Sequence, residues 1–312
     1  MALPKMTGTP APAPAPPPAD PEADLKTGPT RWTRFRRHKL ALVGMAVIGL
    51  MILIAILAPL LAPADPDRGD LFAKLARAGS QMPRQLGTGK FLMGADYMGR
   101  DLLSRLLYGA RISLLVGFVA EAVILAIGVP LGAIAGYYGG KVDKIIMRTA
   151  DVMFAFPDLL FAIAIMFALG SGVINLFIAL GFVGWAGMAR LVRGQVLQVK
   201  ERDFVEAARA SGAPNWLIII RHILPSCLGP VIVAATLGIP GAIMSEAALS
   251  YLGLGVQPPT ATWGSMINDG RGYLLHAPIL SIAPGLAIML TVLSFNLVGD
   301  GLRDAFDPRS NK

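Results

Sequence analysis

The sequence is poor in cysteine, histidine and charged side chains. It has one cysteine, Cys227, so no disulfide can form within the chain and a cysteine-based metal cluster is excluded. Its three histidines, His38, His222 and His276, do not stand at metal-site spacing, so we expect no metal site. Charged residues make up only 15% of the chain, whereas soluble domains carry about 25%.

The chain also lacks a phosphate-binding loop, which would need the pattern G-x-x-x-x-G-K-[ST]. The nearest match ends at Lys90, but Phe91 stands where Ser or Thr is required and Arg84 occupies the first glycine position. We therefore expect that the chain does not hydrolyse ATP, is not an enzyme and binds no cofactor. A function driven by ATP would need a partner subunit to supply the free energy.

Hydrophobic residues are abundant, at 54% of the chain, and the mean hydropathy is +0.59. Several apolar runs can cross a bilayer, because about 20 helical residues at ~1.5 Å each cover its ~30 Å hydrocarbon core. We expect an all-α polytopic membrane protein with spans near residues 41–61, 112–134, 145–169, 174–188, 228–249 and 279–298. The fourth is the weakest of these spans, because it is short and rich in glycine.

The formal net charge is +8, and basic residues gather beside the apolar runs, at residues 31–39 and 190–221. Such charge marks the cytoplasmic side of a membrane protein, so we expect both ends of the chain in the cytoplasm. Nucleic-acid binding is the alternative, and the adjacent spans argue against it. Arg100, Arg105 and Arg111 conflict with this topology because they precede the second span in a loop assigned to the outside, unless one span is miscounted.

These patterns divide the chain into five segments. Residues 1–30 are rich in Pro and Ala and lack the apolar core of a secretory signal, so we expect a disordered or polyproline-like tail. Residues 31–62 form a basic flank and the first span, and residues 63–107 an extracytoplasmic segment. Residues 108–299 form a core of five further spans, and residues 300–312 a cytoplasmic tail.

A polar segment, EAARASGAPNWLIIIRHILP, occupies residues 206–225 between the fourth and fifth spans. Asp203 and Glu206 stand at the spacing of a capping box, which predicts a helix over residues 203–211 with Asp203 at its N-cap. Gly212 suits the C-terminal cap of this helix. The segment therefore opens with a short helix that ends in a glycine turn.

A second short helix is predicted after this turn. Pro214 suits its first turn, and Pro225 ends or kinks it as the chain re-enters the membrane. Its apolar residues recur at helical spacing and predict one apolar face, formed by Trp216, Leu217, Ile220, Ile223 and Leu224. Ala207 and Ala208 give the first helix a smooth surface that fits a groove of a partner protein. DNA binding and a plain loop without a partner are the alternatives, and the flanking spans argue against DNA.

This segment resembles the EAA loop of binding-protein-dependent ABC importer permeases. The match is carried by Glu206, Ala207 and Ala208, by Gly212, and by Leu224 with Pro225. Three further stretches resemble the oligopeptide/dipeptide/nickel branch of that family, in the family's order: residues 94–114, 249–267 and 296–309. The resemblance extends over residues 34–309 and points to the second of two paired permeases, the type found as the C subunit of dipeptide systems.

The resemblance implies a type I ABC importer permease core that forms half of a translocation pathway for di- or oligopeptides across the inner membrane. The implied partners are a second homologous permease in a heterodimer, two cytoplasmic ATPases, an extracytoplasmic substrate-binding protein and membrane lipid, with no nucleic acid. Coupling to the ATPases is implied for Asp203, Glu206, Ala207, Ala208, Gly212, Leu224 and Pro225. Nickel chelates and glutathione are alternative cargoes. A secondary transporter and a membrane scaffold or sensor are alternative classes, and neither explains the loop.

Two glutamates fall within the predicted spans, and ionisable groups at membrane depth are candidates for function. For Glu121, a satisfied polar contact inside the bundle is favoured over a place in the pathway. For Glu246, near the outer end of the fifth span, both interpretations stay open. Arg148 and Asp151 lie one turn apart, and a pair between them is the simple expectation.

Overall fold

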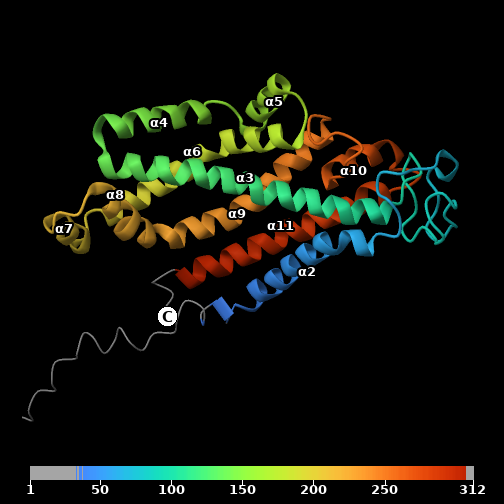
Figure 1. The fold of residues 1–312 in the computed structure, drawn as a ribbon, viewed down its shortest axis with the longest axis horizontal. Helices are drawn as coiled ribbons and strands as arrows, with labels where there is room; N and C mark the ends of the chain where they lie inside the picture. Colours follow the sequence, from blue (N-terminus) through green and yellow to red (C-terminus); the bar gives the residue numbers. More distant parts are fainter. Residues whose placement is uncertain (1–32, 34, 37, 307–312) are drawn as a thin grey trace, which may run out of the picture.

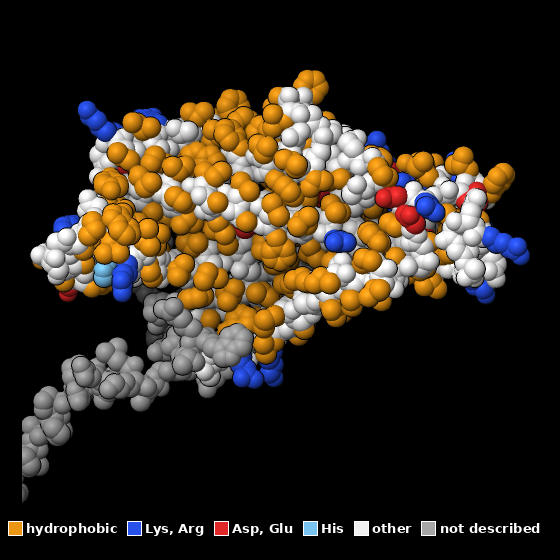
Figure 2. All heavy atoms as spheres, in the orientation of Figure 1, with side chains coloured by type: hydrophobic (Ala, Val, Ile, Leu, Met, Phe, Trp, Pro, Cys, Tyr) orange, Lys and Arg blue, Asp and Glu red, His pale blue; other side chains and the backbone are white. Residues whose placement is uncertain are grey.

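The structure, a computed structural model, describes Thr33, residues 35–36 and residues 38–306. The predicted tail over residues 1–30 lies outside this part. The described residues form an elongated bundle of helices that run along its length (Figure 1). Hydrophobic side chains cover much of the visible surface of the bundle, and most Lys and Arg lie toward its two ends, as in a protein surrounded by lipid (Figure 2).

The bundle is built from helices long and apolar enough to cross a membrane. Within the described residues these are α2 (Lys39–Leu61), α3 (Leu102–Tyr138), α6 (Val173–Val199), α9 (Leu224–Tyr251) and α11 (Ile279–Phe306), with α9 extended back to Asn215 by the preceding turns. They account for five of the six predicted spans. Most of these helices are longer than the apolar runs from which they were predicted, so each helix continues past the ends of its run.

The third predicted span is not one helix. It consists of α4 (Gly140–Phe154) and α5 (Asp158–Leu169), which meet at an angle of 90°. Pro157 is the residue at which the helix cannot continue, because proline has no N–H and its ring clashes with the preceding turn. The prediction of a continuous helix over residues 145–169 is therefore wrong, and the bundle has a sixth span only if this bent pair counts as one.

The two ends of the bundle carry the short elements. One end holds α7 (Asp203–Ala210), α8 (Asn215–Leu217) and η2 (Ile218–Ile223), together with the start of α2 and the end of α11 (Figure 1). His38 Nε2 lies 3.7 Å from Asp304 Oδ2 there. The opposite end holds η1 (Leu71–Ala73), α10 (Trp263–Gly270) and η3 (Arg271–Tyr273). The described ends of the chain thus lie on the same side as the EAA-like segment.

Small residues bring α3 and α6 into close contact. On α3, Gly128, Gly132 and Gly136 recur every four residues and face α6. A Cβ at Gly136 would lie 2.8 Å from the Val196 Cβ, and one at Gly132 would lie 2.9 Å from the Val192 Cβ. Membrane helices associate through such small-residue surfaces because lipid gives no hydrophobic drive between them. On α6, Gly181 and Gly184 lie against Val123 and Ile124 of α3, so these two glycines, which weakened the fourth span as a sequence signal, take part in the packing that holds α6.

This packing predicts a difference between two glycines on facing helices. Gly132→Ala is expected to lower the free energy of unfolding by about 1–3 kcal/mol, the usual cost of overpacking, because the new Cβ meets the backbone and Val192 of α6. Gly194→Ala on α6 meets nothing within 4 Å and should leave stability unchanged or raise it by up to ~1 kcal/mol. Thermal unfolding in detergent measures both, and equal behaviour would contradict the packing argument.

Two of the three arginines that conflicted with the predicted topology are buried in ion pairs. Arg100 Nε lies 2.6 Å from Asp96 Oδ2, and Arg100 Nη2 lies 3.4 Å from Asp269 Oδ2. Arg105 reaches the same two carboxylates at 3.5 and 3.7 Å. Two arginines paired with two aspartates add no free positive charge to this end of the bundle. Arg100 and Arg105 therefore do not oppose the placement of this end of the bundle outside the membrane. Arg111 is exposed and still conflicts with that placement.

Candidate coupling surface and translocation pathway

The N-cap of α7 lies one residue earlier in the chain than the sequence predicted. Its N-cap is Arg202, in an extended conformation (φ −87°, ψ 146°), and no side chain makes a capping hydrogen bond. Asp203 is the first helical residue, so the prediction of Asp203 at the N-cap of a capping box is wrong. Asp203 and Glu206 both lie in the first turn, where negative charge stabilises the positive end of the helix dipole.

The C-terminal end of α7 is closed by Gly212, as predicted. Gly212 has φ +80°, a conformation that residues with a Cβ rarely adopt. Its N–H donates to the Arg209 carbonyl at 3.0 Å, and the Ala213 N–H donates to the Ala208 carbonyl at 3.1 Å. This pair of bonds is the Schellman motif, which satisfies carbonyls that would otherwise be left free at the helix end.

One face of α7 packs on the bundle and the other is open. Val205 is fully buried, in a cluster that includes Val199 and Ile219. Glu206 and Ala207 are exposed, as are Arg209 and Ala210, whereas Ala208 is half-buried. The open side of the helix therefore carries Ala207 and Ala210 beside Glu206 and Arg209, and Asp203 and Phe204 of its first turn are exposed as well.

The second half of the segment does not form the single apolar face predicted for it. After α8, residues Ile218–Ile223 form a π-helix, whose i→i+5 hydrogen bonds alter the angular spacing of side chains. Ile223 is fully buried, whereas Trp216 is 62% and Ile220 59% exposed. Pro225 does not end the helix: it lies in the first turn of α9 and the chain stays helical through it.

Polar contacts connect this segment and the end of α6 to neighbouring helices. The Tyr137 hydroxyl on α3 donates to Asn215 Oδ1 at 2.8 Å. On α6, Arg193 Nη2 donates to Asp143 Oδ2 at 2.6 Å, and Arg190 Nη2 donates to Asp151 Oδ1 at 2.8 Å, both on α4. Asp151 therefore pairs with Arg190 and not with its neighbour on α4, so the expectation of a pair within that helix is wrong.

Of the two membrane glutamates, Glu246 has polar partners. It is fully buried on α9 and accepts a hydrogen bond from the Ser250 hydroxyl at 2.7 Å, while Ser113 Oγ lies 3.5 Å from its other carboxylate oxygen. The same Ser113 oxygen accepts from the backbone N–H of Trp263 at 3.1 Å. The group ties α3, α9 and α10 together, a geometry that suits a polar contact inside the bundle.

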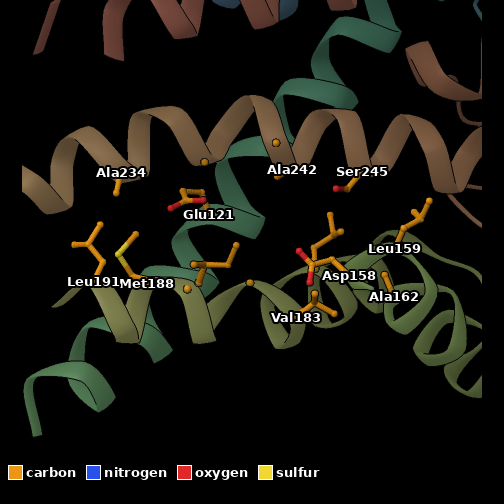
Figure 3. Close-up of a pocket in the computed structure, with 16 residues that line it drawn as sticks. Glu121, Asp158, Leu159, Ala162, Val183, Met188, Leu191, Ala234, Ala242 and Ser245 are labelled. Atoms are coloured by element: carbon orange, nitrogen blue, oxygen red, sulfur yellow. The ribbon is translucent and has the colours of Figure 1, made fainter. Parts of the chain in front are cut away.

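Glu121 has a different environment. Its side chain on α3 is only 4% exposed, yet its Oε1 has no hydrogen-bond partner in the described part of the chain. The prediction of a satisfied polar contact is wrong for this oxygen. The carboxylate lies against Gly238 of α9, where a Cβ would overlap it. Glu121 lines a cavity of about 350 Å³ between α3, α5, α6 and α9, and Asp158 and Ser245 also face this space (Figure 3).

Asp158 was missed by the sequence analysis, because it was placed inside a continuous apolar span. It is in fact the first residue of α5, directly after the break at Pro157. The Pro-Asp pair was the available signal, since proline interrupts the preceding helix and an acidic residue favours the first turn of the next.

Comparison with known proteins identifies the family. Residues 128–312 match the family described as binding-protein-dependent transport system inner membrane component. The chain belongs to this family. Residues 30–81 of the permease match the N-terminal transmembrane domain of oligopeptide transport permease C.

Two curated relatives resemble the permease over most of its length. It is 44% identical to the dipeptide transport system permease protein DppC of Alkalihalophilus pseudofirmus, with 93% of each chain covered. It is 45% identical to the glutathione transport system permease protein GsiD of Escherichia coli O157:H7, with 89% of each chain covered.

Solved structures support the fold. The permease resembles the MetNI methionine ABC transporter in inward facing conformations, with a TM-score of 0.55, 19% identity, and coverage of 66% of this chain and 98% of that one. It also matches a crystal structure of an amino acid ABC transporter with histidines, with a TM-score of 0.50, 15% identity, and coverage of 64% and 94%. The permease has the type I ABC importer fold, as the sequence predicted.

Family membership settles the class of function. The permease is a multi-pass subunit of an ABC importer in the inner membrane, and it works with ATPase and substrate-binding partners. It is not itself an enzyme, because ATP hydrolysis in this family lies in separate ATPase subunits. The classes of secondary transporter and of scaffold or sensor are set aside by the same finding.

Proposed function

We propose that the permease forms one half of a translocation pathway for short peptides, in a heterodimer with a second homologous permease. The similarity to a dipeptide permease and to a glutathione permease supports this proposal. Glutathione is itself a tripeptide, so the cargoes named for both relatives share a peptide backbone with a free ammonium and free carboxylates. Dipeptides are the main proposal, and glutathione is the second candidate because its permease is equally similar.

The proposed contact with the ATPases is the open face of α7, with Glu206, Ala207 and Gly212 as its main residues. The observation that supports it is the position of this alanine surface at an end of the bundle (Figure 1), projecting from its buried anchor at Val205. A helix with small side chains can enter a groove closely. We assign this end to the cytoplasm, which also places the described start of α2 and end of α11 there.

The fold offers a physical route from α7 to the helices that line the cavity. Val205 packs against the π-helix that leads into α9, and the Tyr137–Asn215 hydrogen bond joins the same region to α3. ATP-driven closure of the two ATPases would carry α7 and shift α9 and α3 together, opening the pathway alternately to each side. Such coupling requires an element with two arrangements whose balance the nucleotide changes.

The segments predicted from the sequence are placed on the two sides of the membrane by the same assignment of the α7 end to the cytoplasm. In this proposal the core of the pathway lies within residues 108–299, and residues 63–107 face the substrate-binding protein on the outside. Leu224 and Pro225 start the membrane helix that receives the motion of the loop. Glu246 contributes to the rigidity of the outer half of the bundle.

The proposed function is tested by purification and transport. Tagged permease extracted from its native membrane in mild detergent should bring with it a second permease and two ATPase subunits. The complex in liposomes, with its binding protein and ATP, should accumulate a radiolabelled dipeptide, and excess unlabelled glutathione shows whether that tripeptide competes. A non-hydrolysable ATP analogue serves as the control. Transport by the isolated chain without ATP would contradict the proposal.

A further inference from the structure

The cavity beside Glu121 is acidic, and the described residues that line it carry no compensating positive charge. Its lining includes two carboxylates, those of Glu121 and Asp158, and the Ser245 hydroxyl, with no Lys, Arg or His among the residues that form it. The remaining lining is apolar or glycine. A ligand complementary to this surface carries positive charge and donates hydrogen bonds at one end.

The Glu121 carboxylate is placed to receive such a ligand. Among the described residues Oε1 has no hydrogen-bond partner, although the side chain is only 4% exposed. Oε1 itself is enclosed, and a buried oxygen without a hydrogen bond costs free energy, so a turn of the Glu121 side chain toward a ligand's donor in the cavity is favourable. Gly238 makes this position available, since any side chain at residue 238 would displace the carboxylate.

The second acid lies farther along the same space. Asp158 enters it from the start of α5, and Figure 3 shows Glu121 and Asp158 on separated parts of the gap between α9 and α6. Ser245 on α9 faces the region of Asp158. The cavity, at about 350 Å³, falls at the lower end of the volumes typical of small-molecule sites. It therefore offers two successive anionic contacts and not one.

We propose that this cavity is a cation-binding subsite in which Glu121 receives the ammonium group of a peptide in passage, and Asp158 offers a second contact for it. The inference rests on the proposed function, because it assumes that peptides use this route. An ammonium has three donors and no acceptor, which matches a lining of carboxylates and a hydroxyl. The subsite selects for a free amino terminus, independently of any selection by the binding protein.

The first test measures ligand contact without the binding protein. The whole complex, held in lipid nanodiscs, is treated with a hydrophobic carbodiimide that labels carboxyl groups in apolar sites, and labelling is measured by peptide mass spectrometry. Alanyl-alanine is expected to lower labelling of Glu121 severalfold, whereas N-acetyl-alanyl-alanine is not. Labelling of Asp300, an exposed carboxylate of α11 outside the cavity, provides the internal reference and should not respond to either compound. Equal protection of Glu121 by the two compounds, or by neither, would overturn the proposal.

The second test measures transport. Glu121→Gln keeps the shape of the side chain and removes its charge, and it is expected to lower dipeptide uptake per ATP hydrolysed by about tenfold, the value of one charge-assisted hydrogen bond. Asp158→Asn should have a smaller effect. Asp300→Asn, which removes an exposed carboxylate from α11, is the matched control and should transport like the parent.

These outcomes separate the inference from the proposed function. Absence of peptide uptake by the parent complex would contradict the proposed function itself. Uptake by the parent and by Glu121→Gln at equal rates would overturn only the subsite. Loss of the second permease from the Glu121→Gln complex would also overturn it, because the carboxylate would then belong to the contact between the two permeases.

Discussion

Arg105→Met is expected to lower the free energy of unfolding by about 3–5 kcal/mol, the cost of removing one partner from a buried ion pair. The Arg105 side chain is 3% exposed and faces Asp96 and Asp269, which would be left with Arg100 alone. It also donates to the carbonyls of Pro66 and Pro259, at 3.2 and 3.4 Å. Methionine fills a similar volume but replaces none of these donors. The outer segment would therefore lose one of its two arginine links to Asp269 of α10, and its hydrogen bond to the Pro259 carbonyl in the loop before α10.

The control for this variant is Arg68→Met, on the same side of the bundle. Arg68 pairs with Asp65 at 3.4 Å, but its side chain is 75% exposed. A solvated pair of this kind contributes about 0–1 kcal/mol, so its loss should barely change stability. Thermal unfolding of both variants in detergent gives the comparison. Equal small losses would show that the buried network adds no stability.

The pH dependence gives a second, independent check on Arg105. Burial raises the pKa of Asp269 above its ordinary value, while the nearby Arg105 and Arg100 act to lower it. Without Arg105 this pKa rises further, so the folded variant takes up a proton more readily than its unfolded chain. A group with a raised folded pKa stabilises the fold below that pKa and loses this contribution as pH rises through it. The difference in the free energy of unfolding between the parent and Arg105→Met should therefore become smaller as the pH falls.

The sequence predicted the helices whose interactions are local or set by the membrane. The apolar runs behind α2, α9 and α11 are long and free of charge at their centres, and lipid demands helices from such runs whatever their neighbours. The glycine turn at Gly212 was also predictable, because positive φ is a property of one residue. Both signals can be read without knowledge of the tertiary fold.

The features that sequence reasoning missed depend on contacts between distant residues. The ion pairs of Arg100 and Arg105 with Asp269 could not be predicted because Asp269 lies far along the chain, whereas the local partner Asp96 was available as a signal and was not used. The π-helix over residues Ile218–Ile223 has no simple sequence signal and shifts which side chains are buried. The environment of the Glu121 carboxylate could not be predicted, because it depends on the distant Gly238. The second acid of the cavity, Asp158, is brought there by the 90° turn between α4 and α5.

Gly212→Arg is expected to separate the ATPase subunits from the permease and reduce ATP-driven uptake to background. Two effects combine in this variant. The backbone at φ +80° costs about 1–2 kcal/mol for a residue with a Cβ, which loosens the turn after α7. The arginine side chain also projects from the open end of the proposed coupling surface, where no described residue beyond the two chain neighbours has an atom within 4 Å of the new Cβ. Co-purification and uptake measure the loss.

Gly253→Arg separates these two effects, because Gly253 matches Gly212 in its local geometry. Its φ is +81°, it too meets no atom within 4 Å, and it follows the outer end of α9. The backbone cost and the added charge are thus the same, and only the end of the bundle differs. We expect the Gly253→Arg complex to keep both ATPases. Retention of the ATPases by both variants would show that α7 is not the contact with the ATPases. Loss of the ATPases from both variants would show that backbone strain, and not the position of the arginine, causes the loss.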